Sequence, residues 1–334
     1  MKRKGNLYWK ISLYDNLCHA FNKAAKGKQK HAEVVEFKKN FNENINCLIL
    51  QLKNYEPDIG HYRFFRVHDP KLRSICAASF KEKVLHHAIM NICEPVLESY
   101  SIYDSYACRI GKGTRKAINR ALKFSRATKW YLKLDIKKYF DSIDHKITLK
   151  LLERQFKEKR LIDLFEKLLN TYHTKKGKGV PIGNLISQHL ANFYLGSFDH
   201  WIKEERKISY YIRYMDDFII FGKYKSQLKT ELEEIRYFLK TKLELDLKSN
   251  IQLNRNTHGI TFLGYRVFPN KILLSKQSQK RFVKKFRKYE AHWINGQWGI
   301  HDLIRHMEPL IDFTKGAGSN GFRSYVIERF GVSS

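Results

Sequence analysis

The chain has 334 residues, of which 43% are hydrophobic and 14% aromatic, so it is long enough for two domains or for one elaborated domain with a sizeable core. Its 63 Lys and Arg residues outnumber its 33 Asp and Glu residues and give a formal net charge of +30. Such a charge predicts a polyanionic partner, with nucleic acid first and an acidic membrane surface as the alternative.

Two features of the composition bear on location. No long apolar run is present, and no hydrophobic segment follows Met1-Lys2-Arg3-Lys4, which argues against a membrane span and a signal peptide. The five cysteines are odd in number and include no CxxC pair, which argues against a disulfide framework or a zinc site. We therefore expect a cytoplasmic protein without a membrane partner, with reduced, mostly buried thiols.

The first part of the chain is predicted to be helical and basic. Apolar residues recur at helical spacing from Val34 to Leu52. The cationic stretch 23–30 that precedes them is either a solvated loop or an RNA-contacting arm. An alternating pattern over 61–75 then predicts a hairpin, with its turn at 69–72.

Helix signals follow this hairpin. Ser79 and Glu82 have the spacing of a capping box that opens a helix. Pro95 is expected to end or kink that helix. Thr114 is expected to cap the next one.

The middle of the chain alternates strands and helices. A short apolar strand, 131–136, carries Asp135 near its end, and helices are expected between 151 and 169. The cationic, glycine-rich loop 175–179 leads through 180–188 into another helix. Two apolar runs between 208 and 221 then predict a hairpin with acids at its tip.

An amphipathic helix near 226–243 follows that hairpin, 261–267 reads as another hairpin strand, and the remainder from Lys276 is basic and helical. Helices packed on one face of an antiparallel sheet give the α+β class.

The tip of the 208–221 hairpin is Tyr214-Met215-Asp216-Asp217. Alone, two adjacent acids are more often a polar turn, because Asp bonds its own backbone. Asp135 changes this interpretation, since two strands that end in acids can hold carboxylate oxygens for hard cations such as Mg²⁺. The pattern predicts metal-assisted phosphoryl transfer.

These motifs, in this order, resemble those of reverse transcriptases over about 62–267. Leu134-Asp135-Ile136 with Tyr139-Phe140 is similar to the first palm motif, 183–188 to the second and 214–217 to the third. The resemblance implies a right-hand polymerase fold with fingers, palm and a small helical thumb. Its expected parts are an N-terminal basic helical extension (1–60), fingers (61–128), palm with inserted finger elements (129–267), and thumb with the C-terminal segment (268–334).

The resemblance also implies site residues. Asp135, the Ile136 backbone and Asp216 are expected to bind two Mg²⁺ ions, with Asp217 as an outer partner; Asp135, Asp216 and Asp217 are the catalytic set. Phe140 matches the steric gate that excludes ribonucleotides, with Tyr139 as the alternative exposed ring. The other expected nucleotide-binding residues are Lys71, Arg73, Lys138, Ile182, Gly183, Gln188 and Lys248, and the expected primer grip is Phe262, Leu263, Gly264 and Tyr265.

The second palm motif points to a subgroup. Most of the family has Gln before the glycine, whereas this chain has Ile182-Gly183 followed by Ser187-Gln188. This pattern, together with 104–109 and 111–114, is similar to reverse transcriptases of diversity-generating retroelements. The resemblance implies bacterial or phage-encoded mutagenic retrohoming: error-prone copying of a template RNA into cDNA from dNTPs, with errors opposite adenine. A cDNA/RNA duplex and a small, basic accessory protein are the further partners it implies.

Other functions are also compatible with the sequence. They are a defence-associated enzyme, a group II intron or retron-like reverse transcriptase, and a non-catalytic RNA-binding scaffold that kept the fold. The retained acids together with Arg73 and Phe140 argue against the scaffold.

Overall fold

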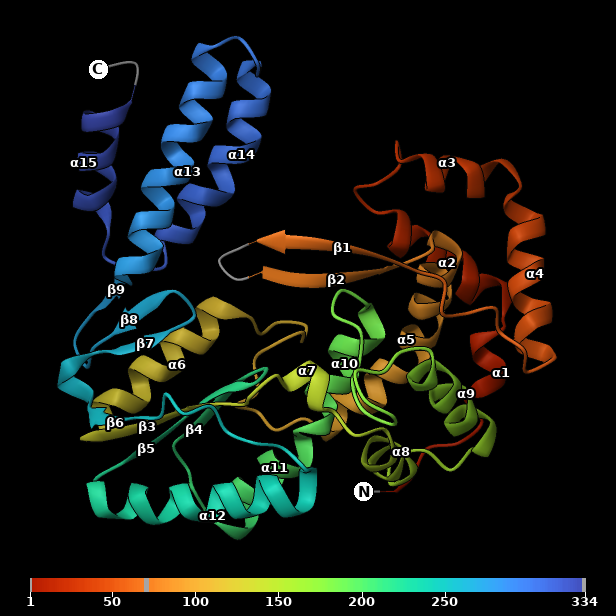
Figure 1. The fold of residues 1–334 in the computed structure, drawn as a ribbon, viewed down its shortest axis with the longest axis horizontal. Helices are drawn as coiled ribbons and strands as arrows, with labels where there is room; N and C mark the ends of the chain where they lie inside the picture. The colour runs from red at the N-terminus through yellow and green to blue at the C-terminus, as the bar shows by residue number, and fades with distance from the viewer. Residues whose placement is uncertain (1, 69–71, 332–334) are drawn as a thin grey trace. The chain divides into compact units, whose positions relative to one another are not determined.

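The computed structural model describes residues 2–68 and 72–331. It forms two compact units, each built from segments that are discontinuous in the sequence. The first unit comprises 1–109, 135–207 and 234–249, and the second comprises 110–134, 208–233 and 250–334. Helices and strands both contribute, which confirms the predicted α+β class (Figure 1).

The first unit is mainly helical. Its long helix α5 packs against α2 and α10, and its β-structure is the antiparallel pair β1 and β2. Its elements are α1 (Tyr8–Ile11), α2 (Tyr14–Ala25), α3 (Ala32–Lys39), α4 (Phe41–Lys53), β1 (Tyr62–His68), β2 (Leu72–Ala78), α5 (Phe80–Tyr100), α7 (Tyr139–Ser142), α8 (His145–Glu153), α9 (Lys159–Asn170), α10 (Leu185–Tyr194), α11 (Gly196–His200) and the π-helix η1 (Trp201–Glu205).

The second unit holds two sheets and the C-terminal helices. One sheet has the strand order β4-β5-β3-β6 and the other β7-β8-β9. Two elements cross the division between the units: α12 (Lys225–Leu243), and β3 (Trp130–Asp135), whose last residue falls in the first unit. The other elements are α6 (Thr114–Ala127), β4 (Tyr211–Tyr214), β5 (Asp217–Gly222), β6 (Gln252–Arg255), the 3-10 helix η2 (Asn256–His258), β7 (Ile260–Phe262), β8 (Tyr265–Val267), β9 (Ile272–Leu274), α13 (Lys276–Ile294), α14 (Ile300–Thr314) and α15 (Asn320–Phe330).

The β1–β2 hairpin confirms the alternating pattern read between 61 and 75. Its register pairs Tyr62 with Ala78 and His68 with Leu72, and most side chains of β1 are exposed. The helix start predicted at Ser79 is confirmed as well, because the Glu82 backbone N–H donates to Ser79 Oγ at 3.2 Å, which is one of the two bonds of a capping box. Glu82 also accepts from the Gly60 N–H at 3.1 Å, so one buried carboxylate joins the base of the hairpin to the first turn of α5.

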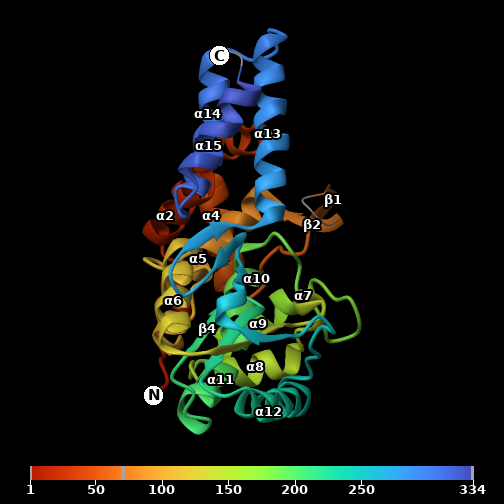
Figure 2. The same cartoon turned by 90° about the vertical axis from the view of Figure 1, so that its left-hand side faces the viewer.

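The C-terminal helices share a core of their own. Phe282 and Phe286 of α13 pack with Met307 of α14 and Val326 of α15, and the three helices lie side by side (Figure 2). The apolar residues of α13 thus face this core while its many Lys and Arg residues lie on the exposed side, as its interleaved sequence predicts.

Two local predictions are wrong, and the prediction that Pro95 ends or kinks its helix is wrong in its first part. The helix expected from Val34 to Leu52 is broken at Asn40, whose φ of −113° and ψ of 46° are not helical. Pro95 does not end α5, which continues to Tyr100; its ring is exposed while Cys93, Val96 and Leu97 are buried, and this packing outweighs the lost backbone bond. Thr114 does not cap α6: Gly113 is the N-cap, and Thr114 Oγ1 lies 3.4 Å from the Tyr214 hydroxyl.

Two predictions drawn from the composition can also be compared with the structure. All five cysteines are free, but only Cys76 and Cys93 are buried and Cys108 is exposed, so the expectation of mostly buried thiols is wrong for the others. Among residues 2–68 and 72–331, no helix combines the length and apolar character needed to cross a bilayer.

Candidate active site

The acid turn between β4 and β5 lies in the second unit. Tyr214 pairs with Asp217 in the antiparallel register, which leaves Met215 and Asp216 at the tip, as predicted. Met215 adopts a left-handed backbone with φ of 56°, a conformation that is uncommon for a residue with a side chain. The buried Arg213 guanidinium donates to the Met215 carbonyl at 3.0 Å, so a charged donor holds the turn from within.

Asp217 has a cationic partner on the neighbouring strand β3. Lys133 Nζ lies 2.9 Å from Asp217 Oδ2, and the same ammonium lies 5.8 Å from the centroid of the Phe262 ring. Lys133 thereby links the acid turn to the segment expected to form the primer grip. Lys133 was not among the site residues predicted from the sequence, although its position two residues before Asp135 places both on one face of the strand.

Asp135 belongs to the first unit, where the segment 246–248 runs alongside it. The Lys248 N–H donates to the Asp135 carbonyl at 2.8 Å, and the Lys137 N–H donates to the Asp246 carbonyl at 2.8 Å. Lys248 Nζ also lies 2.5 Å from Asp135 Oδ1. The sequence placed Lys248 with the nucleotide; in the structure it contacts the carboxylate itself.

These contacts test whether the acids suit a metal. Within each unit, the described residues contain no group of three His, Cys, Asp or Glu side chains that could hold an ion together. Asp135 and Asp217 nevertheless each hold one cation, the ammonium of a lysine. Hard carboxylate oxygens directed at a positive charge are the donors that divalent ions such as Mg²⁺ prefer. The residues therefore fit a metal that takes the place of the lysine nitrogens.

The segment after Asp135 separates the two candidates for the steric gate. Lys138 has φ of 46° and precedes the short helix α7. Tyr139 is buried, and its hydroxyl donates to the Ala191 carbonyl. Phe140 is only half-buried. Of the two rings, Phe140 is the one accessible to a ligand.

The second palm motif is held against the hairpin. The Cys76 N–H of β2 donates to the Ile182 carbonyl at 2.7 Å. Gly183 has φ of 114°, and a Cβ there would lie 2.8 Å from the Cys76 carbonyl oxygen. Only glycine accepts both this conformation and this close approach.

The stretch 104–109 packs beside the same motif. Cys108 Sγ lies 3.7 Å from Gln188 Oε1, and the Asn192 amide donates to the Ala107 carbonyl at 3.0 Å. Arg109 is anchored by Glu98, with a closest contact of 2.7 Å. Two segments singled out separately in the sequence, 104–109 and 183–188, are thus in direct contact in the first unit.

The remaining nucleotide-binding candidates are Arg73 and Lys71. Arg73 is exposed on β2, opposite Val67 in the register. Lys71 lies outside the described residues.

The segment 262–265 is the turn between β7 and β8. Phe262 and Tyr265 are buried, while Leu263 and Gly264 both have positive φ, 50° and 88°. The Gly264 carbonyl accepts from the Ser275 N–H at 3.0 Å and from Ser278 Oγ at 2.7 Å. This turn is therefore fixed to the start of α13.

Comparison with known proteins assigns a family. The sequence model of the reverse transcriptase (RNA-dependent DNA polymerase) family matches residues 67–267, more than half of the chain. The chain belongs to the reverse transcriptase family. Members of this family are metal-dependent RNA-directed DNA polymerases, and the matched range contains every acid, nucleotide-binding residue and primer-grip residue predicted from the sequence.

Relatives of this reverse transcriptase include proteins encoded in introns. It is 26% identical to Protein YkfC of Escherichia coli over 296 residues, covering 72% of this chain and 76% of that protein. It is 23% identical to the group II intron-encoded protein LtrA of Lactococcus lactis over 315 residues, covering 73% and 52%. A putative COX1/OXI3 intron 1 protein of Saccharomyces cerevisiae is 26% identical over 237 residues, covering 66% and 27%. The chain thus spans about half of LtrA and about a quarter of the yeast protein.

Solved structures support the fold. The apo telomerase of Candida tropicalis superposes with a TM-score of 0.50 at 13% identity, covering 72% of this chain and 54% of that chain. The same enzyme in complex with a fragment of telomeric RNA gives a TM-score of 0.50 at 10% identity, covering 80% and 55%. At these identities the likeness shows the fold alone.

We predict that Gly264→Ala destabilises the second unit. An added Cβ would lie 2.8 Å from Phe313 Cζ and 2.9 Å from Ser278 Oγ, at a φ of 88°. We expect a loss of about 1–3 kcal/mol in the free energy of unfolding, measured in urea. The control is Gly321→Ala, at a site with nothing within 4 Å, where the effect should be neutral or stabilising by up to about 1 kcal/mol. Equal losses for the two variants would contradict the assigned role of Gly264.

Proposed function

We propose that the chain copies a template RNA into cDNA from dNTPs, using Asp135, Asp216 and Asp217 as its catalytic carboxylates. The observation that carries the proposal is that Asp135 and Asp217, both within the matched family range, are each held by a lysine ammonium. The formal charge of +30 supports a nucleic-acid substrate. The RNA in one telomerase complex is consistent with this choice.

The carboxylates and the backbone of Ile136 would hold two Mg²⁺ ions, which when bound lower the pKa of the primer 3′-hydroxyl and stabilise the leaving pyrophosphate. The work of the chain itself is to keep these acids oriented. Lys133 does so for Asp217 and Lys248 does so for Asp135, as opposite charges at hydrogen-bond distance. Because neither ion pair is fully buried, either lysine can yield its position to a divalent cation at less cost than a fully buried pair would require.

Asp135→Asn and Asp216→Asn are expected to lower primer extension on poly(rA)/oligo(dT) by roughly 10³-fold, which corresponds to about 4 kcal/mol of transition-state stabilisation. RNA binding should stay near that of the unmodified chain, because the amide keeps the shape of each side chain. Asp163→Asn, a change of the same charge on α9, serves as the control and should leave extension intact. A chain with either Asn that still extends the primer at the original rate would refute the assignment.

Nucleotide selection is assigned to residues of the first unit. Arg73, with its planar fork of donors, suits the triphosphate, with Lys71 and Lys138 as further cations. Phe140 is proposed to exclude the ribose 2′-hydroxyl, a role that its partial exposure supports and that the buried Tyr139 is less suited to fill. The turn 262–265 is proposed as the primer grip and the α13 cations as contacts to the duplex.

Phe140→Ala is expected to reduce discrimination between dNTP and rNTP by roughly 10- to 100-fold, because the contact that excludes the 2′-hydroxyl is lost. Single-nucleotide incorporation kinetics with paired dNTP and rNTP measure this ratio. Tyr139→Phe, which removes only the hydroxyl that donates to Ala191, should keep discrimination. Unchanged discrimination in Phe140→Ala would refute this role of Phe140.

We further propose that the enzyme is of the diversity-generating type, with errors opposite template adenine. Support comes from Ile182, which replaces an amide donor with an apolar side chain, and from the contact of 104–109 with Gln188 and Asn192. The competing assignment is a group II intron-type reverse transcriptase, which the relatives LtrA and the yeast intron protein favour. A defence-associated enzyme is the other alternative, and each would use the same polymerase chemistry.

Ile182→Gln is expected to lower misincorporation opposite template adenine by about tenfold, since a restored amide adds a polar constraint near the nucleotide. Sequencing of cDNA made on one defined RNA template measures the error spectrum. Ile110→Gln, at a residue 87% exposed, is the control and should leave the spectrum unchanged. Low adenine errors in the unmodified chain would support the group II alternative.

A further inference from the structure

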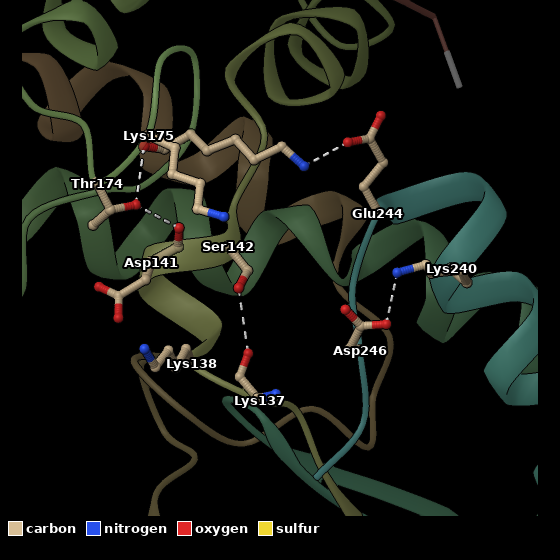
Figure 3. A pocket seen from close by; sticks show the side chains of 10 residues that line it. Lys137, Lys138, Asp141, Ser142, Thr174, Lys175, Lys240, Glu244 and Asp246 are labelled. Atoms are coloured by element: carbon tan, nitrogen blue, oxygen red, sulfur yellow. Dashed lines mark hydrogen bonds and ion pairs between the residues drawn. The ribbon is translucent and has the colours of Figure 1, made fainter.

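A large basic pocket lies in the first unit, beside the Asp135 segment. Its volume is about 940 Å³. Lys137 and Lys138, two and three residues after Asp135, contribute to one wall, and the loop carrying Lys175 and Lys178 contributes to another. Figure 3 shows the loop at Thr174 and Lys175 across from the segment that carries Lys240, Glu244 and Asp246.

The pocket carries a net positive charge, and only part of it is used in ion pairs. Five lysines line it against three acids, so the lining carries two more positive than negative charges. Two ion pairs use some of this charge: Lys178 Nζ to Glu244 Oε2 at 2.5 Å, and Lys240 Nζ to Asp246 Oδ1 at 2.8 Å. Within the described part of the chain, no ion pair is recorded for Lys137, Lys138 or Lys175.

The polar neutral groups of the pocket are already engaged. Thr174 Oγ1 donates to the Asp141 carbonyl at 2.8 Å, and Ser142 Oγ donates to the Lys137 carbonyl at 3.3 Å (Figure 3). The donors that remain for a ligand are therefore ammonium groups. Each ammonium is a compact charge with three N–H donors, and several of them entering from two walls need a ligand with several anionic oxygens.

A bound anion can replace the carboxylates of the two ion pairs. Glu244 is 52% exposed and Asp246 is 59% exposed, so either carboxylate can turn into water when a stronger anion reaches its lysine. Exposed pairs of this kind contribute little stability, about 0–1 kcal/mol each. Glu244 and Asp246 thus keep Lys178 and Lys240 in place without preventing anion binding.

We propose that this pocket binds a condensed phosphate, with Lys175 and Lys178 as donors that no catalytic role requires. The source of the ligand rests on the proposed function: it is either the pyrophosphate released by polymerisation or the triphosphate tail of a nucleotide. The pocket begins within three residues of Asp135, which places condensed phosphate next to the proposed site of phosphoryl transfer. Pyrophosphate held there would slow its own release and favour the reverse reaction.

The test is equilibrium binding of inorganic pyrophosphate to the full chain by calorimetry, at fixed ionic strength and with a chelator present. The chelator removes metal-bridged binding at the carboxylates. Lys175→Ala is expected to weaken binding roughly tenfold, the effect of one charge-assisted hydrogen bond. Lys176→Ala removes the same charge from the next residue, which does not line the pocket, and should change affinity by less than about twofold.

A second variant shifts affinity in the other direction. Glu244→Gln removes the carboxylate that competes for Lys178 and should strengthen pyrophosphate binding about threefold. A dNTP measured in parallel separates the sources: equal sensitivity of dNTP and pyrophosphate to Lys175→Ala assigns the site to the nucleotide tail, and sensitivity of pyrophosphate alone assigns it to the free product.

Equal effects of Lys175→Ala and Lys176→Ala, or an unchanged affinity in Glu244→Gln, would overturn the proposal. Because no synthesis is measured, this result is independent of primer extension. Pyrophosphate binding that depends on Lys175 in a chain without polymerase activity would support the pocket and refute the proposed function. Polymerase activity without such binding would support the proposed function and refute the pocket.

Discussion

Negative charge at the ends of two strands has to be balanced by positive charge, and the segments around these ends supply a lysine to each of two carboxylates. Asp135 at the end of β3 contacts Lys248, and Asp217 at the start of β5 contacts Lys133. The four side chains are between 16% and 33% exposed. Each pair is therefore buried enough to hold the orientation of its carboxylate, and accessible enough to water for a metal ion to replace the lysine. A fully buried pair would hold its carboxylate too tightly, because breaking it costs about 3–5 kcal/mol.

Backbone strain occurs in three of the motif segments as well as elsewhere in the chain. Lys138, Met215 and Leu263 all have positive φ without being glycine, a conformation that costs on the order of 1 kcal/mol or more. Each of these three residues lies within a segment that resembles a family motif, and a neighbouring group supports two of them. Arg213 donates to the Met215 carbonyl, and the carbonyl of Gly264, which follows Leu263, accepts from Ser275 and Ser278. Rigid turns of this kind hold functional atoms in place, which a flexible loop could not do.

The sequence was most informative where structure is local. The hairpin carrying Asp216, the helix cap at Ser79 and the helix α12 all depend on residues within a few positions of one another, and all were predicted. The continuous helix expected through Asn40 and the helix end expected at Pro95 were wrong because tertiary packing decided them: Phe37 and Phe41 both pack on Phe21, and buried residues on both sides of Pro95 hold α5 together.

The partners of the acids were harder to predict. Lys248 lies 113 residues from Asp135, and no spacing rule connects them in a chain with so many lysines. Lys133 could have been found, because strand alternation puts it on the face that carries Asp135. The Gly183 contact with β2 and the contact of 104–109 with α10 depend on distant segments, so local pattern could identify the residues but not their neighbours.

The excess positive charge of the chain is arranged in two different ways, and the arrangement indicates what each part can bind. On α13, Lys276, Lys280, Lys284 and Lys288 recur every four residues, which spaces them about 6 Å apart along the helix. Three of them line an open groove with Arg287 and Phe322. A row of this kind suits a polymer whose phosphates repeat along a line. The lysines beside Asp135 instead converge on one concave space, where an extended backbone could present few phosphates at once. A compact anion with several charged oxygens satisfies that arrangement better, so net charge alone does not describe how this chain meets its ligands.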